Sequence, residues 1–340
     1  MGTPLDPGQA AFYGRFVAAA YDMFAVNEND LRPAPKNIPA GWELSAWINM
    51  SDFLFQIEDP KFYGIVVHEI ANADNRIIAI RGTEGIIEWL DDAASIVMVP
   101  FKQAPSAGRV AYGFDKIYST MKIVPVPHIA PGQAVAAEAE AELTGSFGDQ
   151  LEQLALRREA ERGVARQFAA GRDRRDRPTV VTGHSLGSAL ATLFVLEEST
   201  KHKFDISLIS TLASPKVGNL KFKHVFDALP LTSWRIFNIR DLVPKVPPTV
   251  PFILDYEHVD VAYSFDSSLF AKKNLGCYHS VDTYLHWLDN SVPLAPECVE
   301  RTENREQGTE NREQRTGNRE QGTENREQGT DRQSPRTCRR

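Results

Sequence analysis

The stretch GHSLG at residues 183–187 constrains the fold of this chain more than any other. It follows a short apolar, β-branched run at 179–182 and precedes an apolar run with helical character at 188–196. A strand, a sharp Gly-x-Ser-x-Gly turn and a helix together hold a serine hydroxyl exposed at the end of a sheet, where it can attack a carbonyl carbon. Glycines flank the turn because side chains there would collide with the neighbouring strand or helix. The motif therefore predicts Ser185 as a nucleophile.

Strands and helices alternate along most of the chain. Two β-rich runs at 62–70 and 76–81 flank a turn of Asn and Asp residues and predict a hairpin. The second run is continuously apolar from Ile77 to Ile80, which is typical of a buried central strand. The other predicted elements are, in chain order, helices at 9–24 and 150–170, strands at 206–212 and 234–239, a hairpin at 256–263 and a helix at 281–289. This alternation predicts an α/β fold with a mostly parallel central sheet flanked by helices.

Two stretches differ from this pattern in composition. Residues 131–177 are rich in Ala, Glu and Arg and poor in aromatic residues. They predict a helical, loosely ordered insertion whose charged helix crosses over to the Ser185 strand. From residue 301 the chain is a seven-residue repeat whose units contain no apolar residue, so no coiled-coil seam can form and disorder is predicted. We therefore expect one folded domain over 1–300 and a separate tail over 301–340.

The repeat has a simple explanation at the level of the gene. Three copies of the heptanucleotide ACAGGGA, read in frame, encode Thr-Gly-Asn-Arg-Glu-Gln-Gly, which is the unit at 316–322. One base change in the Gly codon gives the Glu of the other units. We hypothesise that the tail is a translated DNA repeat, dispensable for folding and activity.

Charge and composition exclude several classes of protein. The formal net charge is −7 and no basic patch is present, so a nucleic-acid partner is not expected. No window approaches twenty apolar residues, so no transmembrane helix is expected. The first thirty residues show no secretory signal, which predicts a cytoplasmic location. The three cysteines, Cys277, Cys298 and Cys338, are odd in number and late in the chain, which predicts reduced thiols. No pair has metal-ligand spacing, and neither a metal nor an organic cofactor is expected.

A serine nucleophile needs an acid partner later in the chain. An imidazole must take the hydroxyl proton, and a carboxylate must orient that imidazole. In this kind of fold the three residues follow one another in the order Ser, Asp, His. Asp241 is favoured as the acid because it comes just after the strand at 234–239, whose carboxyl end would present it. Asp255 and Asp260 are rivals, but both lie within or beside the predicted hairpin.

The base must be one of five histidines that follow the serine. His279 is favoured because it lies at the entrance to the predicted helix 281–289, where a side chain can point out of the fold toward the serine. His286 follows seven residues later and could share that helical face. The remaining candidates lie in exposed-looking segments or in the predicted hairpin: His202, His224 and His258.

The tetrahedral intermediate needs two backbone N–H donors for its oxyanion. One is expected from Leu186, directly after the nucleophile, and the other from the loop Arg81-Gly82-Thr83, which follows the strand that ends at Ile80. A short amphipathic segment at 85–92 follows that loop. It is interpreted either as a buried helical turn or as a lid over an apolar, lipid-facing site, with the apolar residues Ile86, Ile87, Trp89 and Leu90.

These features together resemble the class 3 lipases, the fungal-lipase-like α/β-hydrolases, from about residue 10 to residue 290. The motifs that carry the resemblance are RGT at 81–83 followed by Trp89 and Asp92, TGHSLG at 182–187, SPKVGN at 214–219, the segment 235–244, and His279. The resemblance implies the α/β-hydrolase fold. It also implies a catalytic triad of Ser185, Asp241 and His279, and an oxyanion hole formed by Thr83 and Leu186. The chain departs from the family pattern at Ser188, where a second glycine is usual.

The predicted function is that of a serine hydrolase that cleaves lipid acyl esters through an acyl-enzyme, as triacylglycerol lipases do. The expected partners are a lipid or other acyl ester substrate and a transient lipid interface. A phospholipase A1 or a short-chain carboxylesterase on the same fold is the first alternative. A catalytically inactive lipid-binding protein is the second.

Overall fold

The computed structural model describes residues 3–51, 59–83, 97–127, 142–162, 178–249 and 255–300. By contacts the chain divides into two units, Met1–Cys298 and Val299–Arg340. The predicted tail at 301–340 and the lid candidate at 85–92 lie outside the described residues, as do 128–141 and 163–177 around the predicted insertion. The fold below is therefore that of the first unit.

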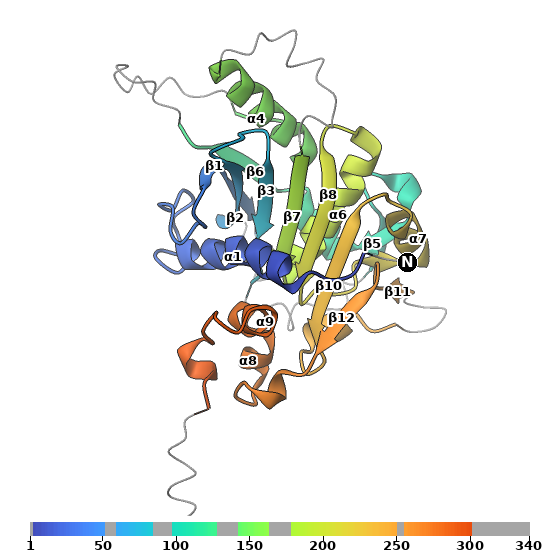
Figure 1. Cartoon of the computed structure of the whole chain (residues 1–340). Coiled ribbons are helices and arrows are strands. Elements are labelled where there is room, and N and C mark those ends of the chain that lie inside the picture. Colours follow the sequence, from blue (N-terminus) through green and yellow to red (C-terminus); the bar gives the residue numbers. More distant parts are fainter. Residues whose placement is uncertain are drawn as a thin grey trace, which may run out of the picture. The chain divides into compact units, whose positions relative to one another are not determined.

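A central sheet organises this unit (Figure 1). Among the described residues it has eight strands in the order β12-β10-β8-β7-β3-β2-β1-β6. Their bounds in chain order are β1 Trp42–Ser51, β2 Pro60–Glu69, β3 Arg76–Ile80, β6 Lys122–Pro125, β7 Pro178–His184, β8 Asp205–Leu212, β10 Thr232–Asn238 and β12 Ala262–Phe265. Neighbours are parallel from β12 to β3 and antiparallel from β3 to β6. The predicted α/β fold with a mainly parallel central sheet is confirmed.

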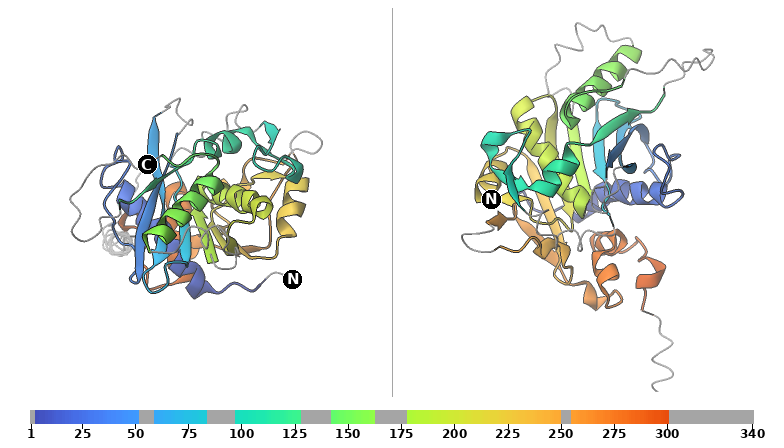
Figure 2. Two further views of the ribbon diagram at one scale, coloured as in Figure 1. Left: turned by 90° about the horizontal axis from the view of Figure 1, so that it is seen from above. Right: turned by 180° about the vertical axis from the view of Figure 1, so that it is seen from behind.

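Helices cover both faces of this sheet (Figure 2). One face carries α1 and α9, and the other carries α3, α4, α6 and α7. The helices span α1 Pro7–Phe24, α3 Tyr112–Tyr118, α4 Phe147–Glu161, α6 Leu186–Lys201, α7 Leu220–Asp227, α8 Leu275–His279 and α9 Val281–Leu288. Short 3-10 turns lie at Pro105–Ala107, Val243–Lys245, Ser267–Leu269 and Pro296–Cys298.

Strand β3 shows how the apolar sequence fills both layers. Ile78 and Ile80 pack into the core under α6, whereas Ile77 and Ala79 pack into the core under α1. Successive side chains of a strand point to opposite faces, so a strand that is buried on both faces must be apolar throughout. The predicted hairpin is also present, because β2 and β3 pair antiparallel across the turn at residues 70–75.

The hairpin predicted at 256–263 is wrong. Its first part is β11 (Tyr256–Glu257), which joins a small antiparallel sheet with β4 (Met98–Pro100), β5 (Arg109–Ala111) and β9 (Gly218–Asn219). Its second part is β12, which runs parallel to β10 at the edge of the main sheet. The buried Arg235 side chain donates to the Val259 carbonyl oxygen, and Asp260 adopts a φ of 60°, so the chain turns away instead of folding back on itself.

The crossover helix predicted at 150–170 is α4. It begins at Phe147, three residues earlier, because Ser146 and Asp149 form a capping box that satisfies the first backbone donors. Phe147, Leu151 and Leu154 are buried in the main core. The described part of this helix is thus packed against the body of the fold.

A cluster of charged side chains is buried where α4 meets α6. Glu197 is fully buried and binds Lys201 Nζ at 2.8 Å, and it also accepts from the hydroxyls of Tyr118 and Ser146. The adjacent Glu198 is 3% exposed, and its Oε1 has no hydrogen-bond partner among the described residues. Burial, with a smaller contribution from the Glu197 charge, raises the pKa of Glu198 to about 7.

This raised pKa predicts a pH-dependent stability. A carboxyl group whose pKa is higher in the folded than in the unfolded chain contributes its full stabilisation when the pH is below its ordinary pKa of 4.5. This contribution is lost as the pH rises through the folded-state pKa of about 7. We expect Glu198→Gln to remove this loss, which is on the order of 3 kcal/mol. Urea unfolding at about pH 5 and about pH 8 measures it. The exposed control Glu142→Gln should keep the wild-type pH dependence, and identical curves for Glu198→Gln and the wild type would contradict the assignment.

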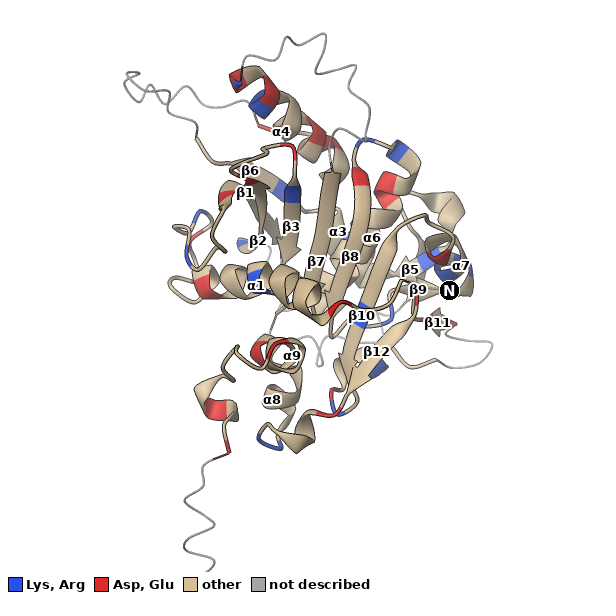
Figure 3. Ribbon diagram, in the orientation of Figure 1, with Lys and Arg blue, Asp and Glu red and all other residues tan. Residues whose placement is uncertain are grey.

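Basic and acidic residues are interspersed over the described elements in the view of Figure 3. Of the helices that the structure describes, none combines enough length and apolarity to cross a bilayer.

Candidate active site

Ser185 lies between β7 and α6, at the turn that the motif predicts. Its backbone has φ 58° and ψ −127°, a region that residues other than glycine rarely adopt. The Ser185 N–H donates to the Leu212 carbonyl oxygen at the end of β8 (2.9 Å). Strain of this kind costs about 1–3 kcal/mol and persists only where the surroundings enforce it.

The two flanking glycines leave room for this turn. A Cβ atom on Gly187 would lie 2.1 Å from the Ile80 carbonyl oxygen, and one on Gly183 would lie 2.5 Å from the Gly187 carbonyl oxygen. Both neighbours are backbone atoms, so no side-chain rotation can relieve the clash. The close approach of α6 to the ends of β3 and β7 therefore requires glycine at both positions.

The contacts of the Ser188 hydroxyl account for a serine at the position where the family usually has glycine. Its Oγ lies 2.7 Å from the Gly183 carbonyl oxygen and 2.8 Å from the Leu212 carbonyl oxygen. A glycine could not make these contacts. The hydroxyl ties the first turn of α6 to the ends of β7 and β8.

Asp241 follows β10 and is almost completely buried, with 1% of its surface exposed. Its Oδ1 accepts from the Val243 N–H (2.9 Å), and its Oδ2 lies 2.7 Å from His279 Nδ1. Oδ2 also accepts from the Tyr284 hydroxyl (2.8 Å). A buried carboxylate with this many donors is held in one orientation.

His279, the last residue of α8, connects the acid and the serine. Its Nε2 lies 2.8 Å from Ser185 Oγ, while its Nδ1 faces Asp241. A carboxylate can only accept, so in the neutral imidazole Nδ1 carries the proton and Nε2 accepts from the serine hydroxyl. The structure thus brings together the three side chains that the sequence singles out, from segments 94 residues apart at most.

Tyr284 of α9 is a site residue that the sequence analysis misses. Its hydroxyl donates to Asp241 and accepts from the Asn238 N–H (3.0 Å). Burial and the nearby Asp241 charge raise the pKa of Tyr284 well above its ordinary value, so it stays a donor. No motif marks this tyrosine, because its role depends on how α9 packs against the end of β10.

The loop after β3 lies against the nucleophile turn. A Cβ atom on Gly82 would lie 2.6 Å from Ser185 Cβ, so the loop and the turn are in direct contact. Arg81 holds the loop from behind: its Nε and Nη2 donate to the Phe62 carbonyl oxygen at 3.0 and 2.7 Å. Thr83 is the last described residue of this loop, and Leu186 begins α6. The lid candidates Ile86, Ile87, Trp89 and Leu90 lie outside the described residues.

The rival acids and bases have other surroundings. His258 is partly buried and donates to the Pro244 carbonyl oxygen, and desolvation lowers its pKa to about 3. His286 binds the Val292 carbonyl oxygen, and His202 ends α6 in a left-handed conformation. The others lie on exposed or partly exposed positions away from the hydrogen bonds of Ser185: His224, Asp255 and Asp260.

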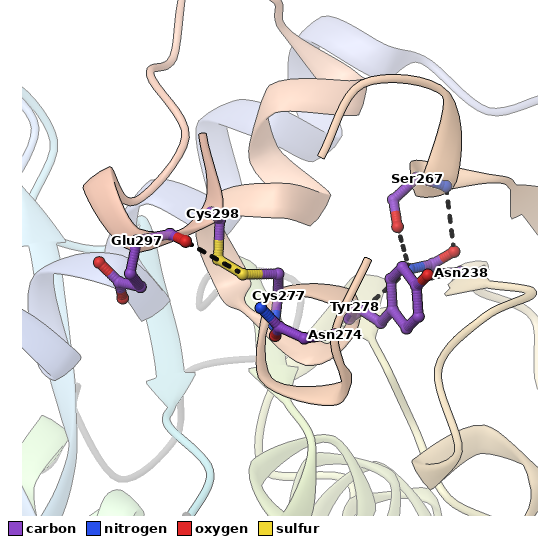
Figure 4. Close-up of a disulfide and its surroundings, with 7 residues drawn as sticks. All are labelled: Asn238, Ser267, Asn274, Cys277, Tyr278, Glu297 and Cys298. Atoms are coloured by element: carbon purple, nitrogen blue, oxygen red, sulfur yellow. Dashed lines mark hydrogen bonds between the residues drawn. A yellow bond between two sulfur atoms is a disulfide. The ribbon is translucent and has the colours of Figure 1, made fainter. Parts of the chain in front are cut away.

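Two cysteines correct a prediction from the sequence. Cys277 and Cys298 form a disulfide, where reduced thiols are expected from the odd count (Figure 4). The Lys272 N–H donates to the Cys298 carbonyl oxygen (2.9 Å), which places the two segments side by side. An odd number of cysteines does not exclude one pair. The link attaches the short helix that carries His279 to the segment after α9.

The described part of the chain contains no group of three or more His, Cys, Asp or Glu side chains that could hold a metal ion. The prediction that no cofactor is needed stays a prediction. The chemistry that the geometry at Ser185 supports is nucleophilic attack with proton transfer to a neighbouring imidazole.

Comparisons of sequence and structure identify known proteins that resemble this chain. Two curated relatives are "Phospholipase A1-Igamma3, chloroplastic" of Arabidopsis thaliana, 27% identical over 63% of this chain and 42% of that protein, and "Phospholipase A1-II 3" of Oryza sativa subsp. indica, 27% identical over 80% of this chain and 60% of that protein. The chain spans less than two thirds of the length of either.

Among solved structures, Rhizomucor miehei triacylglyceride lipase superposes with a TM-score of 0.51 at 19% identity, over 78% of this chain and 83% of that one. The propeptide complex of a deletion mutant of the Rhizomucor miehei lipase gives the same TM-score at 18% identity, over 78% of this chain and 69% of that one. These two show a shared fold. Residues 77–250 match the family described as lipase (class 3). Because the match covers just over half of the residues, this chain belongs to the class 3 lipase family.

Proposed function

We propose that the protein hydrolyses carboxylic esters, with lipid acyl esters as substrates, through a covalent acyl-enzyme. The observation that carries this proposal is the hydrogen-bond chain from Ser185 through His279 to Asp241 at a strained strand-to-helix turn. Membership of the class 3 lipase family supports the lipid substrate.

The reaction would use each of the three side chains in turn. Ser185 Oγ attacks the ester carbonyl carbon while His279 Nε2 takes the hydroxyl proton, and Asp241 stabilises the imidazolium that forms. The tetrahedral intermediate collapses when His279 gives this proton to the leaving alcohol. Water then attacks the acyl-enzyme by the same route and releases the fatty acid and Ser185. Asp241 keeps His279 in the tautomer that this cycle requires.

The oxyanion of each intermediate needs fixed donors. We propose the backbone N–H groups of Leu186 and Thr83, because the loop and the turn that carry them are in contact at Gly82. Losing one such donor costs about 10²- to 10³-fold in rate. We also propose that Ile86, Ile87, Trp89 and Leu90 form a lid that contacts lipid, in keeping with their amphipathic sequence.

The head group of the substrate separates two candidates. The resemblance in sequence favours a triacylglycerol substrate, whereas the names of the curated relatives favour phospholipase A1. Both reactions need the same three side chains. A short-chain carboxylesterase would need them too, without an interface.

Product analysis decides between these substrates. We expect the full chain to release fatty acid from dispersed lipid faster than from a soluble short-chain nitrophenyl ester. Phosphatidylcholine with different acyl chains at the two glycerol positions, and emulsified triolein, are the substrates to compare. Release from the first glycerol position supports phospholipase A1, and release from triolein supports a triacylglycerol lipase. Turnover of the soluble ester alone would contradict a lipid substrate.

A catalytically inactive lipid-binding protein would keep the fold without the chemistry. A fluorophosphonate probe forms a stable adduct only with an activated serine. We expect the probe to label the wild type but not the Ser185→Ala variant. An unlabelled wild type that still binds lipid would support the binding function.

We further propose that the hydrolase domain spans 1–300 and that the tail at 301–340 is not part of it. The sequence predicts a cytoplasmic location, whereas the Cys277–Cys298 disulfide favours an oxidising compartment, because such links persist mainly there. Alkylation of thiols before cell lysis, combined with fractionation of the tagged full chain, decides between these locations.

A further inference from the structure

A partly buried chain of hydrogen bonds runs beside the reacting atoms. The Gly82 N–H donates to the Tyr21 hydroxyl (2.8 Å), and this hydroxyl lies 2.8 Å from His184 Nδ1. His184 Nε2 then lies 2.8 Å from the backbone carbonyl oxygen of His279. The chain thus joins the loop after β3, helix α1, strand β7 and the short helix α8. None of its three hydrogen bonds reacts in the proposed cycle.

The direction of each bond follows from the groups involved. The His279 carbonyl oxygen can only accept, so His184 Nε2 must carry a proton and donate. In the neutral ring Nδ1 is then the acceptor, and the Tyr21 hydroxyl donates to it. The same hydroxyl oxygen accepts from the Gly82 N–H. Every donor in this chain therefore has one acceptor.

His184 is held in the neutral form that this arrangement needs. It is buried, with 3% of its surface exposed, and burial together with the nearby His279 lowers the pKa of His184 well below its ordinary value. A neutral ring matters because a cation here would oppose the imidazolium that forms on His279.

His184 also touches His279 through its ring. The two ring centroids are 4.7 Å apart with an interplanar angle of 40°. His184 thus contacts both the backbone and the imidazole of the base. Tyr284, which holds Asp241, packs edge-on against the same His184 ring at 5.8 Å.

The other end of the chain fixes the loop that carries Thr83. A Cβ atom on Gly82 would lie 2.6 Å from Ser185 Cβ and 2.7 Å from the Tyr21 hydroxyl oxygen, so Gly82 is packed between the two. The guanidinium of Arg81 donates to the Gly82 carbonyl oxygen (2.7 Å). The N–H and the carbonyl oxygen of Gly82 are therefore both hydrogen-bonded, and Tyr21 and Arg81 together fix its position.

We propose that Tyr21 and His184 are positioning residues for the ester hydrolysis proposed above, which fix the loop carrying Thr83 and the backbone of His279 relative to Ser185. They act without touching the substrate. This inference depends on the proposed function. It assigns a role to the second residue of GHSLG and to a tyrosine 61 residues before Gly82 in the chain.

Tyr21→Phe tests the proposal by removing one hydroxyl and nothing else. We expect kcat to fall about 10- to 100-fold with KM unchanged, because a misplacement of about 1 Å among reacting groups costs roughly 10²-fold. The inhibition constant of a trifluoromethyl ketone with an apolar tail, which forms a tetrahedral oxyanion on the serine, should rise by the same factor. A residue that only supports the fold would lower the melting temperature without this selective loss.

His184 gives a second, independent variant. His184→Gln keeps an N–H donor and an acceptor in its side chain and should retain more activity than His184→Leu, which keeps neither. Tyr13→Phe is the matched control, because it makes the same change on α1, and Tyr13 packs against the cores under this helix. Wild-type kcat and inhibition are expected for it.

The outcomes separate this inference from the proposed function. If the wild type turns over ester and Ser185→Ala does not, but Tyr21→Phe and His184→Leu match the wild type, the positioning role is overturned and the hydrolase stands. If the kcat of Tyr21→Phe recovers fully at a lower temperature, the role is structural and the inference falls. If the wild type neither hydrolyses ester nor reacts with a fluorophosphonate, both proposals fall.

Discussion

Replacing Ser185 by alanine is expected to lower ester turnover by roughly 10⁴- to 10⁶-fold while the protein stays folded. The change removes the hydroxyl that lies 2.8 Å from His279 Nε2. It leaves the backbone hydrogen bond of the turn in place. The turn itself depends on the Ser185 N–H, which donates to Leu212 and is kept in the variant. Initial rates on a lipid substrate and a circular dichroism melt measure the two effects separately.

Ser199→Ala is the control for this variant, because it makes the same substitution on α6 at a hydroxyl that only donates to the Leu196 carbonyl oxygen. It should keep the wild-type rate and still react with a fluorophosphonate. Normal turnover by Ser185→Ala would mean that the attacking group is another one, and the proposed mechanism would be wrong.

Gly187→Ala is expected to cost the protein its fold. The added Cβ atom would lie 2.1 Å from the Ile80 carbonyl oxygen and 2.6 Å from the Ile80 carbonyl carbon. Overpacking against mobile side chains costs about 1–3 kcal/mol, but here both neighbours are strand backbone. The variant should lose at least about 4 kcal/mol of stability and accumulate as insoluble protein. Soluble yield and the urea midpoint of any folded fraction measure this loss.

Gly8→Ala provides the comparison. It lies in the first turn of α1, and its Cβ atom would meet only the Asp6 carboxylate oxygen at 3.4 Å. A gain of about 0.5–1 kcal/mol is expected, because alanine restricts the unfolded chain at a position whose helical backbone it can adopt. If Gly187→Ala were as stable as Gly8→Ala, the close packing of α6 against β3 would be refuted.

Sequence reasoning succeeds where the deciding interactions are local. The turn at Ser185 and the hairpin of β2 and β3 are set by glycines, apolar runs and turn residues that are close together in the chain. The positions of Asp241 and His279 in the fold follow from chain order and from the ends of predicted elements. The turn and the hairpin can be read from a window of a few residues, and the order of the elements along the chain supplies the rest.

The errors and omissions have a different origin. The segment at 256–263 looks like a hairpin because alternation alone does not say with which strand a residue pairs. Cys277 and Cys298 pair across a sequence separation of 21 that includes α9, so their proximity depends on how that helix packs. Tyr21 and Tyr284 act through helices that approach the site only in the folded chain. Partners that are distant in sequence therefore leave no local pattern.

The order of the strands has a consequence for how this chain can change. Ser185 leaves β7 at its carboxyl end, whereas the connection from α4 enters β7 at Pro178, roughly 20 Å away along the strand. The connection therefore joins the sheet at the strand end that is remote from Ser185. An internal tag inserted between α4 and β7 is expected to leave the hydrogen bonds of Ser185 intact.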